Sequence, residues 1–176
     1  MKTNYQAIKA IYFHEMDRFR RTLGQSLVSP VLSTSLYFIV FGSVIGGYVQ
    51  KIDGISYGSY IVPGLLILTL LTQSISNTSF GIFFPKFNGT IYEILAAPIS
   101  SFEVVLAFVG AGATKTLIVG IVIFITSTFF VDVQVKYPLL MIFLMLIVAF
   151  TFALFGFLIG LLSSNFEQLS VIPTLV

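Results

Sequence analysis

The chain has 176 residues, of which 57% are hydrophobic and only 9% are charged, and its mean hydropathy is +1.02. A chain of this length cannot bury so much apolar surface in a soluble core, so the composition predicts a membrane protein. The sequence contains no cysteine, which excludes disulfides, thiolate metal sites and cysteine nucleophiles. The formal net charge of +2 is too small to indicate a nucleic-acid partner.

The N-terminal segment, residues 1–24, is predicted to form an amphipathic helix at the cytoplasmic membrane surface. Apolar residues recur in it at three- and four-residue spacing and form one face, which comprises Tyr5, Ile8, Tyr12, Met16, Phe19 and Leu23. Most charged residues fall on the opposite side, which suits a helix in the headgroup plane. Glu15 is the exception, because helical geometry places it inside the apolar arc, and we expect it to have a partner.

Residues 25–176 are predicted to form an all-α transmembrane domain with four spans and the start of a fifth. The spans are expected at residues 27–49, 60–84, 102–130 and 139–162, because each holds the roughly 20 apolar residues that cross about 30 Å of hydrocarbon. A partial fifth span is expected at residues 169–176. Basic residues are concentrated before the first span, so the N-terminus and the connections 85–101 and 163–170 are predicted to be cytoplasmic.

A single lysine, Lys115, stands within the third predicted span, in the stretch FVGAGATKTLIVG. A phosphate-binding loop is disfavoured, because Thr114 and Val109 occupy the positions where that motif needs glycine. The small residues instead predict a close helix-packing seam, which comprises Gly110, Gly112, Ala113, Thr116 and Gly120. A cation in lipid costs about 2.5–3.5 kcal/mol on insertion scales, so Lys115 is expected either to pair with a carboxylate such as Glu15 or to act in a transport path.

Residue types that carry other chemistry are scarce. The acidic residues lie in the N-terminal helix or at loop edges, which disfavours a proton- or sodium-coupled carrier. With one histidine and no cysteine, we predict no metal site, and no residue pattern indicates catalytic residues. Two pairs with small-xxx-small spacing, Gly42 with Gly46 and Gly156 with Gly160, predict close helix crossings, either in general packing or in a dimer interface.

The connection between the second and third predicted spans is expected to hold a short helix at about residues 88–97. Asn88 gives a start signal and Pro98 a stop signal, with Glu93 between them. Its predicted apolar face consists of Ile91, Ile94 and Leu95. From the residues alone, this helix is either a docking element for a cytosolic partner or an amphipathic connector that rests on lipid.

At this loop the chain resembles the ABC-2-type permeases, the bacterial membrane subunits of ATP-binding-cassette exporters. The resemblance rests on the N-terminal helix with Glu15, Arg18 and Arg21 and on the small residues and cation of the third span. It also rests on the segments SPVLSTSLYFIVFG, YIVPGLL, FNGTIYEILAAPIS and NFEQLSVIPTLV. It covers essentially the whole chain, and the order of these motifs is more specific than any one of them.

The resemblance implies a six-span permease of the bacterial inner membrane that forms a homodimer with a second copy and binds two cytosolic ATPase subunits. ATP and Mg are then expected on the partner and no cofactor on this chain, which would be a transport subunit and not an enzyme. The apolar spans are compatible with a cargo that is lipid-like, a glycolipid or polysaccharide, or a hydrophobic drug. A non-transporting membrane scaffold or a small secondary carrier would be the alternatives.

The resemblance also implies roles for individual residues. Glu15, Arg18 and Arg21 would belong to an interface helix that contacts the ATPase or the coupling loops. The chain departs from the family in length, because its fifth span stops at Val176, so we expect a truncated form. The implied ATPase-coupling helix comprises Asn88, Gly89, Thr90, Ile91, Tyr92, Glu93, Ile94 and Leu95.

Overall fold

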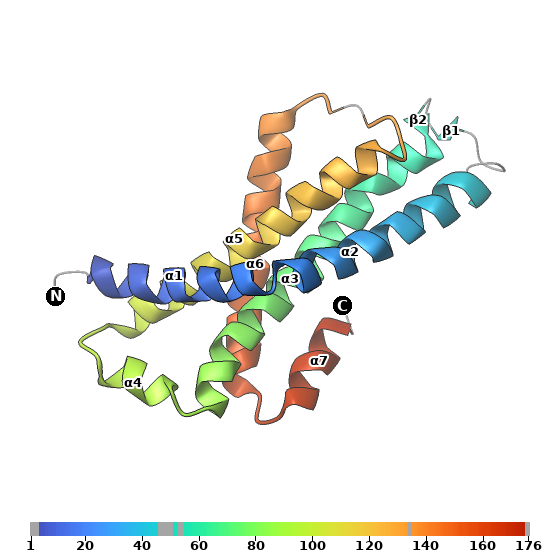
Figure 1. Cartoon of the computed structure of the whole chain (residues 1–176). Helices are drawn as coiled ribbons and strands as arrows, with labels where there is room; N and C mark the ends of the chain where they lie inside the picture. The colour runs from blue at the N-terminus through green and yellow to red at the C-terminus, as the bar shows by residue number, and fades with distance from the viewer. Residues whose placement is uncertain (1–3, 46–50, 53–54, 134, 175–176) are drawn as a thin grey trace.

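The computed structural model describes residues 4–45, 51–52, 55–133 and 135–174, and these are almost entirely helical (Figure 1). This confirms the predicted all-α membrane class, with one hairpin of two-residue strands as the additional feature. In chain order the elements are α1 (Tyr5–Arg21), α2 (Leu23–Tyr37), the π-helix η1 (Phe38–Ile45), β1 (Lys51–Ile52), β2 (Ile55–Ser56), α3 (Tyr57–Phe87), α4 (Ile91–Ala96), α5 (Ser101–Thr128), α6 (Pro138–Leu162) and α7 (Phe166–Thr174).

Four helices in the described part of the chain are long and apolar enough to cross a membrane, and they match the four predicted spans. They are Leu23–Phe41, Tyr57–Phe87, Ser101–Thr128 and Pro138–Leu162. The first begins before the predicted residue 27, and its predicted end at residue 49 lies outside the described residues. The second extends past both predicted ends, because Ser56 caps it with its hydroxyl and Asn88 continues its backbone hydrogen bonding.

The central helix of the bundle is α3, which packs against α5 and α6 along much of its length. Small residues permit this close approach. A Cβ atom at Gly156 on α6 would lie 2.5 Å from the backbone oxygen of Ile75 on α3. At Gly120 on α5, a Cβ would lie 2.7 Å from Leu70 Cδ2. The α3–α6 contact therefore depends on backbones that meet directly, whereas at Gly120 a side chain fills the space beside the glycine.

The other predicted packing residues are placed as follows. Gly112 of α5 lies directly against the Thr78 side chain of α3, and Gly160 of α6 lies against Ser79. Thr116 is fully buried in α5. Gly42 belongs to η1, whereas Gly46 lies outside the described residues, so the geometry of that pair is not described.

The bundle has two distinct ends (Figure 1). The β1–β2 hairpin and the α5–α6 connection lie at one end, where the Ser59 hydroxyl donates to the Asp132 backbone oxygen at 2.9 Å. At the other end lie α4 and the α6–α7 turn, where Lys86 Nζ donates to the backbone oxygens of Leu161 at 2.7 Å and Ser163 at 2.8 Å. Since α3 is 31 residues long, about 46 Å at 1.5 Å per residue, it is longer than the roughly 30 Å of hydrocarbon that it has to cross.

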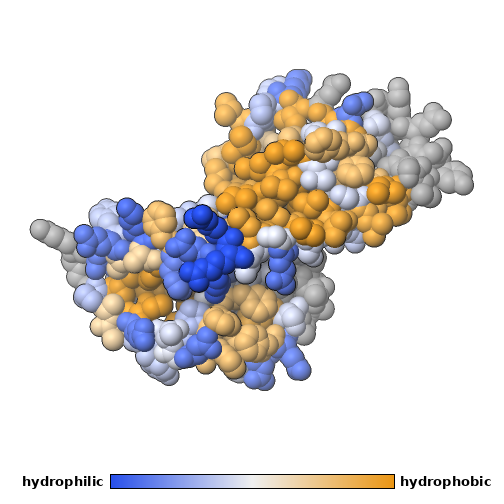
Figure 2. Space-filling model, viewed as in Figure 1, coloured by the Kyte–Doolittle hydropathy of each residue, from blue (hydrophilic) through white to orange (hydrophobic). Residues whose placement is uncertain are grey.

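Helix α1 crosses the bundle beside α5 and ends where α2 turns into the first candidate span. Figure 2 shows hydrophilic residues gathered around the end of α1 and a broad apolar surface beginning beyond it. The last turn of α1 carries Arg18, Arg20 and Arg21. The predicted amphipathic helix is therefore present, but its most buried side chains, Glu15 and Phe19, pack into the protein. Tyr5, at the start of the predicted apolar face, is 76% exposed.

Candidate functional site

A buried cluster of three charges joins α1 to α5. Glu15 Oε2 accepts a hydrogen bond from Lys115 Nζ at 2.7 Å and another from Arg18 Nη2 at 2.8 Å. The side chains of Glu15 and Lys115 are only 2% and 3% exposed, whereas that of Arg18 is 34% exposed. The partner of Lys115 is thus Glu15, one of the two roles that the sequence left open for this lysine. Two cations share one carboxylate, so the cluster carries a formal charge of +1.

Neighbouring residues make room for this cluster. A Cβ added at Gly81 of α3 would lie 3.3 Å from Glu15 Oε2, so glycine lets α3 pass close to the carboxylate. One helical turn before the cluster, the Tyr12 hydroxyl donates to Thr114 Oγ1 at 3.1 Å, and Thr114 Oγ1 in turn donates to the Gly110 backbone oxygen at 2.8 Å. These contacts attach the middle of α1 to α5 and place it next to α3.

The stretch around Lys115 is a continuous part of α5. Its backbone N–H groups are therefore used in helical hydrogen bonds and cannot cradle a phosphate as a glycine-rich loop does. The Lys115 ammonium is also engaged by Glu15. The helical setting thus supports the prediction that this stretch is a packing surface with one cation.

A second carboxylate, Glu103, links the starts of α1 and α5. Its Oε1 accepts from the backbone N–H of Asn4 at 2.7 Å, and its Oε2 accepts from the backbone N–H of Ser100 at 2.8 Å. Ser100 and Glu103 form a capping box at the start of α5, while the Asn4 side chain caps α1. The S-x-x-E spacing could have revealed the capping box. The contact with Asn4 had no such signal, because the two residues are 99 positions apart.

The predicted coupling helix is shorter than residues 88–97. Asn88 is the C-cap of α3, Gly89 has φ +80°, and α4 then covers Ile91–Ala96. A positive φ is available to glycine at little cost but does not occur inside a right-handed helix, so the Asn88 start signal was misread. The Thr90 hydroxyl donates back to the Pro85 backbone oxygen at 3.3 Å, which closes this turn.

One side of α4 meets the bundle and the other is exposed. Ile91 and Ile94 are partly buried against the core that contains Phe108 and Phe157. Tyr92 and Leu95 are 74% and 66% exposed, and Glu93 is exposed with them. Of the predicted apolar face, Ile91 and Ile94 contact the bundle, whereas Leu95 lies on the exposed side.

The predicted site residues thus form two groups. Glu15, Arg18 and Lys115 come together, whereas the α4 residues lie at the end of the bundle, and Arg21 is exposed at the end of α1. In the described part of the chain, no three His, Cys, Asp or Glu side chains are grouped as metal ligands. The group of Glu15, Arg18 and Lys115 is held together by charge pairing between α1 and α5.

Comparisons with known proteins agree with the resemblance noted from the motifs. The family model for the ABC-2 type transporter matches residues 6–176. The chain is 36% identical over its 176 residues to the inner membrane transport permease YadH of Escherichia coli K12, and covers 69% of that protein. The protein of the same name from Shigella flexneri shows the same identity and coverage. No solved structure gives a significant match.

Proposed function

Because the chain belongs to the ABC-2 type transporter family, we propose that it is the membrane subunit of an exporter driven by ATP hydrolysis in separate cytosolic subunits. It is a multi-pass inner-membrane transport permease, a transport subunit rather than an ATPase. The proposal extends this to an outward direction of transport, to a complex of two permease copies with two ATPase subunits, and to ATP and Mg bound only by the partner.

The observation that carries the proposal is the exposed side of α4. Tyr92, Glu93 and Leu95 project from the end of the bundle, next to the strongly turned backbone at Gly89. Two large apolar side chains beside a carboxylate offer the mixed character of a protein-docking surface, in which aromatic anchors supply much of the binding energy. This supports a role for α4, and for the turn at Asn88–Thr90, in coupling to the ATPase.

The contacts around α4 supply a route for mechanical transmission. The loop from α4 to α5 is held by the Asn4 side chain, whose Nδ2 donates to the Pro98 backbone oxygen at 3.4 Å, and by Glu103. Helix α1 is held again at Glu15 by Lys115. A displacement of α4 would therefore move α1 and α5 together as one body, the type of element that shifts a transporter between two states.

The apolar surface supports a bilayer-facing substrate path and a second copy. Helix α2 is little covered by the rest of the chain, and its Val28, Leu32 and Leu36 are 54%, 64% and 63% exposed. Such a face is expected against lipid or against another permease subunit. A lipid-like, glycolipid, polysaccharide or hydrophobic drug cargo is the substrate class that we propose.

The test is ATP hydrolysis and transport by the permease reconstituted with its cytosolic ATPase partner. Glu93→Ala removes the exposed carboxylate of α4, and Gly89→Pro forces φ to about −65° where the turn has +80°. Both variants should assemble in the membrane but lose permease-dependent stimulation of hydrolysis. Glu167→Ala is the matched control, because Glu167 is an exposed glutamate of α7 outside the coupling loop. Unchanged stimulation in both α4 variants would refute the assignment.

Crosslinking gives an independent readout. The chain has no cysteine, so Thr90→Cys introduces a single reactive thiol. A crosslink from this position to the ATPase supports docking at α4. Wild-type transport without such a crosslink would refute docking there, and ATPase binding elsewhere without transport would favour the scaffold alternative.

A further inference from the structure

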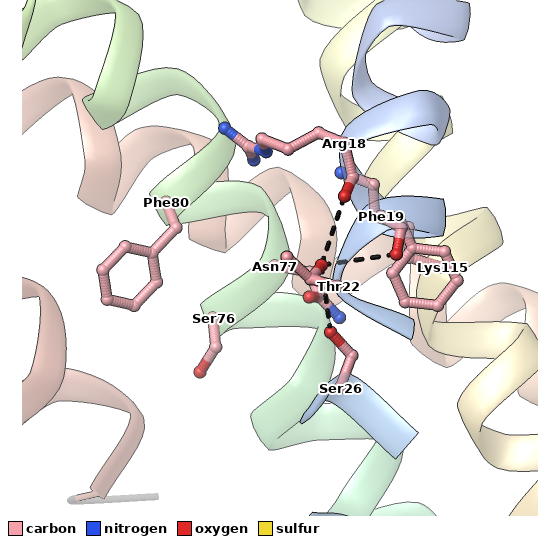
Figure 3. A pocket seen from close by; sticks show the side chains of 8 residues that line it. All are labelled: Arg18, Phe19, Thr22, Ser26, Ser76, Asn77, Phe80 and Lys115. Atoms are coloured by element: carbon pink, nitrogen blue, oxygen red, sulfur yellow. Dashed lines mark hydrogen bonds between the residues drawn. The ribbon is translucent and has the colours of Figure 1, made fainter. Parts of the chain in front are cut away.

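A polar pocket of about 120 Å³ lies where α1 turns into α2 (Figure 3). The α1–α2 segment, α3 and α5 each contribute side chains to it. Its polar lining consists of Arg18, Thr22, Ser26, Ser76, Asn77 and Lys115. The volume is many times the roughly 10–15 Å³ that one ordered water requires, so the pocket can admit a larger polar group.

The pocket has an excess of positive charge. Arg18 and Lys115 both line it, and the carboxylate that neutralises them, Glu15, supplies one oxygen for both. No aspartate or glutamate is among the described residues that line the cavity. An arginine has five N–H donors and a lysine has three, so each cation keeps further N–H donors after its hydrogen bond to Glu15. A formal charge of +1 in a partly desolvated cavity favours an anionic ligand.

The remaining lining also suits an oxyanion. Thr22, Ser26 and Ser76 present hydroxyl groups, and Asn77 presents an amide. The Thr22 hydroxyl donates to the backbone oxygens of Arg18 and Phe19, at 3.2 and 3.3 Å, and the Ser26 hydroxyl donates to Thr22 Oγ1 at 3.5 Å (Figure 3). Asn77 Nδ2 donates to Gln73 Oε1 at 3.4 Å, which leaves its second N–H. The donors offered to a phosphate are therefore chiefly the guanidinium and ammonium groups of Arg18 and Lys115.

The position of the pocket indicates where such a phosphate would come from. Its Thr22 and Ser26 stand at the start of the first candidate span, which begins at Leu23. Figure 2 shows the hydrophilic surface at the end of α1 meeting the apolar surface at this level. Phe80 of α3 also lines the pocket and is 39% exposed, so an apolar side chain lies beside the polar groups at this boundary. A polar pocket next to an exposed apolar side chain suits the headgroup region of a lipid.

We propose that this pocket binds the phosphate of an anionic membrane lipid, held by Arg18 and Lys115 with the Ser76 hydroxyl and the second N–H of Asn77. The lipid would sit in the break between α1 and α2 and contact α3 and α5 at the same time. Its phosphate would neutralise the formal charge of +1 that remains when Glu15 pairs with both Arg18 and Lys115. The proposal depends on placement in a membrane and does not depend on the ATPase partner or the cargo.

The experiment measures lipid retention on the purified chain by native mass spectrometry, after reconstitution in nanodiscs of phosphatidylglycerol or of phosphatidylcholine. The wild type should retain phosphatidylglycerol in preference to phosphatidylcholine. Arg18→Gln should weaken that retention about tenfold or more, because one charge-assisted hydrogen bond contributes at least this factor. Arg20→Gln removes the same charge two residues away from an exposed position and should change retention less than about twofold.

Asn77→Asp supplies a second variant that places a negative charge in the pocket with almost no change in shape, and it too should reduce retention. Melting temperatures of the variants establish that they remain folded. Equal retention by the Arg18 and Arg20 variants, or equal retention of the two lipids by the wild type, would overturn the proposal. Inorganic phosphate added in excess should not displace the lipid, and full displacement would assign the site to a soluble anion instead.

Discussion

Removing the buried lysine is the most informative perturbation of this fold. Lys115 and Glu15 are 2.7 Å apart, which corresponds to about 6 kcal/mol of attraction at an effective dielectric constant of 20. Desolvation of the two charges offsets most of that gain, but a single charge left buried is destabilising by about 3–5 kcal/mol. Because Arg18 remains 2.8 Å from Glu15, we expect Lys115→Met to fall near the lower limit, at about 3 kcal/mol.

The measurement is reversible unfolding in mixed detergent micelles, followed by circular dichroism. The free energy of unfolding of the double variant Glu15→Gln with Lys115→Met should be closer to the wild-type value than that of either single variant. Replacing a whole buried ion pair is often nearly neutral for stability. Arg21→Met, an exposed basic residue of the same helix, should change stability by no more than about 0.5 kcal/mol. Additive effects of the two single substitutions would refute a direct buried ion pair.

Three further predictions concern helix contacts. Gly156→Val should destabilise the α3–α6 interface by about 1–3 kcal/mol, since a Cβ there meets Ile75 backbone atoms at 2.5–3.1 Å. Gly64→Ala is the control and should be neutral or stabilising, because a Cβ at Gly64 has no atom within 4 Å. Unfolding of the two variants in detergent compares their stabilities. Glu103→Gln replaces one accepting carboxylate oxygen with an N–H₂ donor, so one of the two hydrogen bonds from Asn4 and Ser100 is lost. Hydrogen exchange at the start of α1 should rise as a result. Lys86→Met removes both hydrogen bonds from Lys86 Nζ to the α6–α7 turn and should speed limited proteolysis of that turn. An unchanged cleavage rate would contradict a role for Lys86 in stabilising the turn.

The membrane architecture was predictable because the length of an apolar run alone decides whether a helix can span. The buried position of Glu15 was predictable for a similar reason, since helical spacing placed it among Tyr12 and Phe19. The same geometry, with the cost of a cation in lipid, made Glu15 a candidate partner for Lys115. These features follow from local periodicity and elementary energetics.

Other features depend on three-dimensional placement that one sequence does not encode locally. The limits of α4 depend on the positive φ of Gly89, and a glycine in a polar loop permits that conformation without requiring it. The bond from Asn4 to Glu103 joins residues that meet only after α1 has packed beside α5. The pocket between Thr22 and Asn77 likewise exists only once α1, α2, α3 and α5 have come together.

The pairing of Glu15 with Lys115 has a consequence for biogenesis. The carboxylate precedes the ammonium by 100 residues, so α1 has left the ribosome well before α5 is presented to the membrane. Inserting a lysine into the bilayer without a paired carboxylate costs about 2.5–3.5 kcal/mol of free energy on insertion scales. With α1 at the membrane surface, the Glu15 carboxylate can neutralise Lys115 as α5 inserts, which lowers the free-energy cost of inserting the third span.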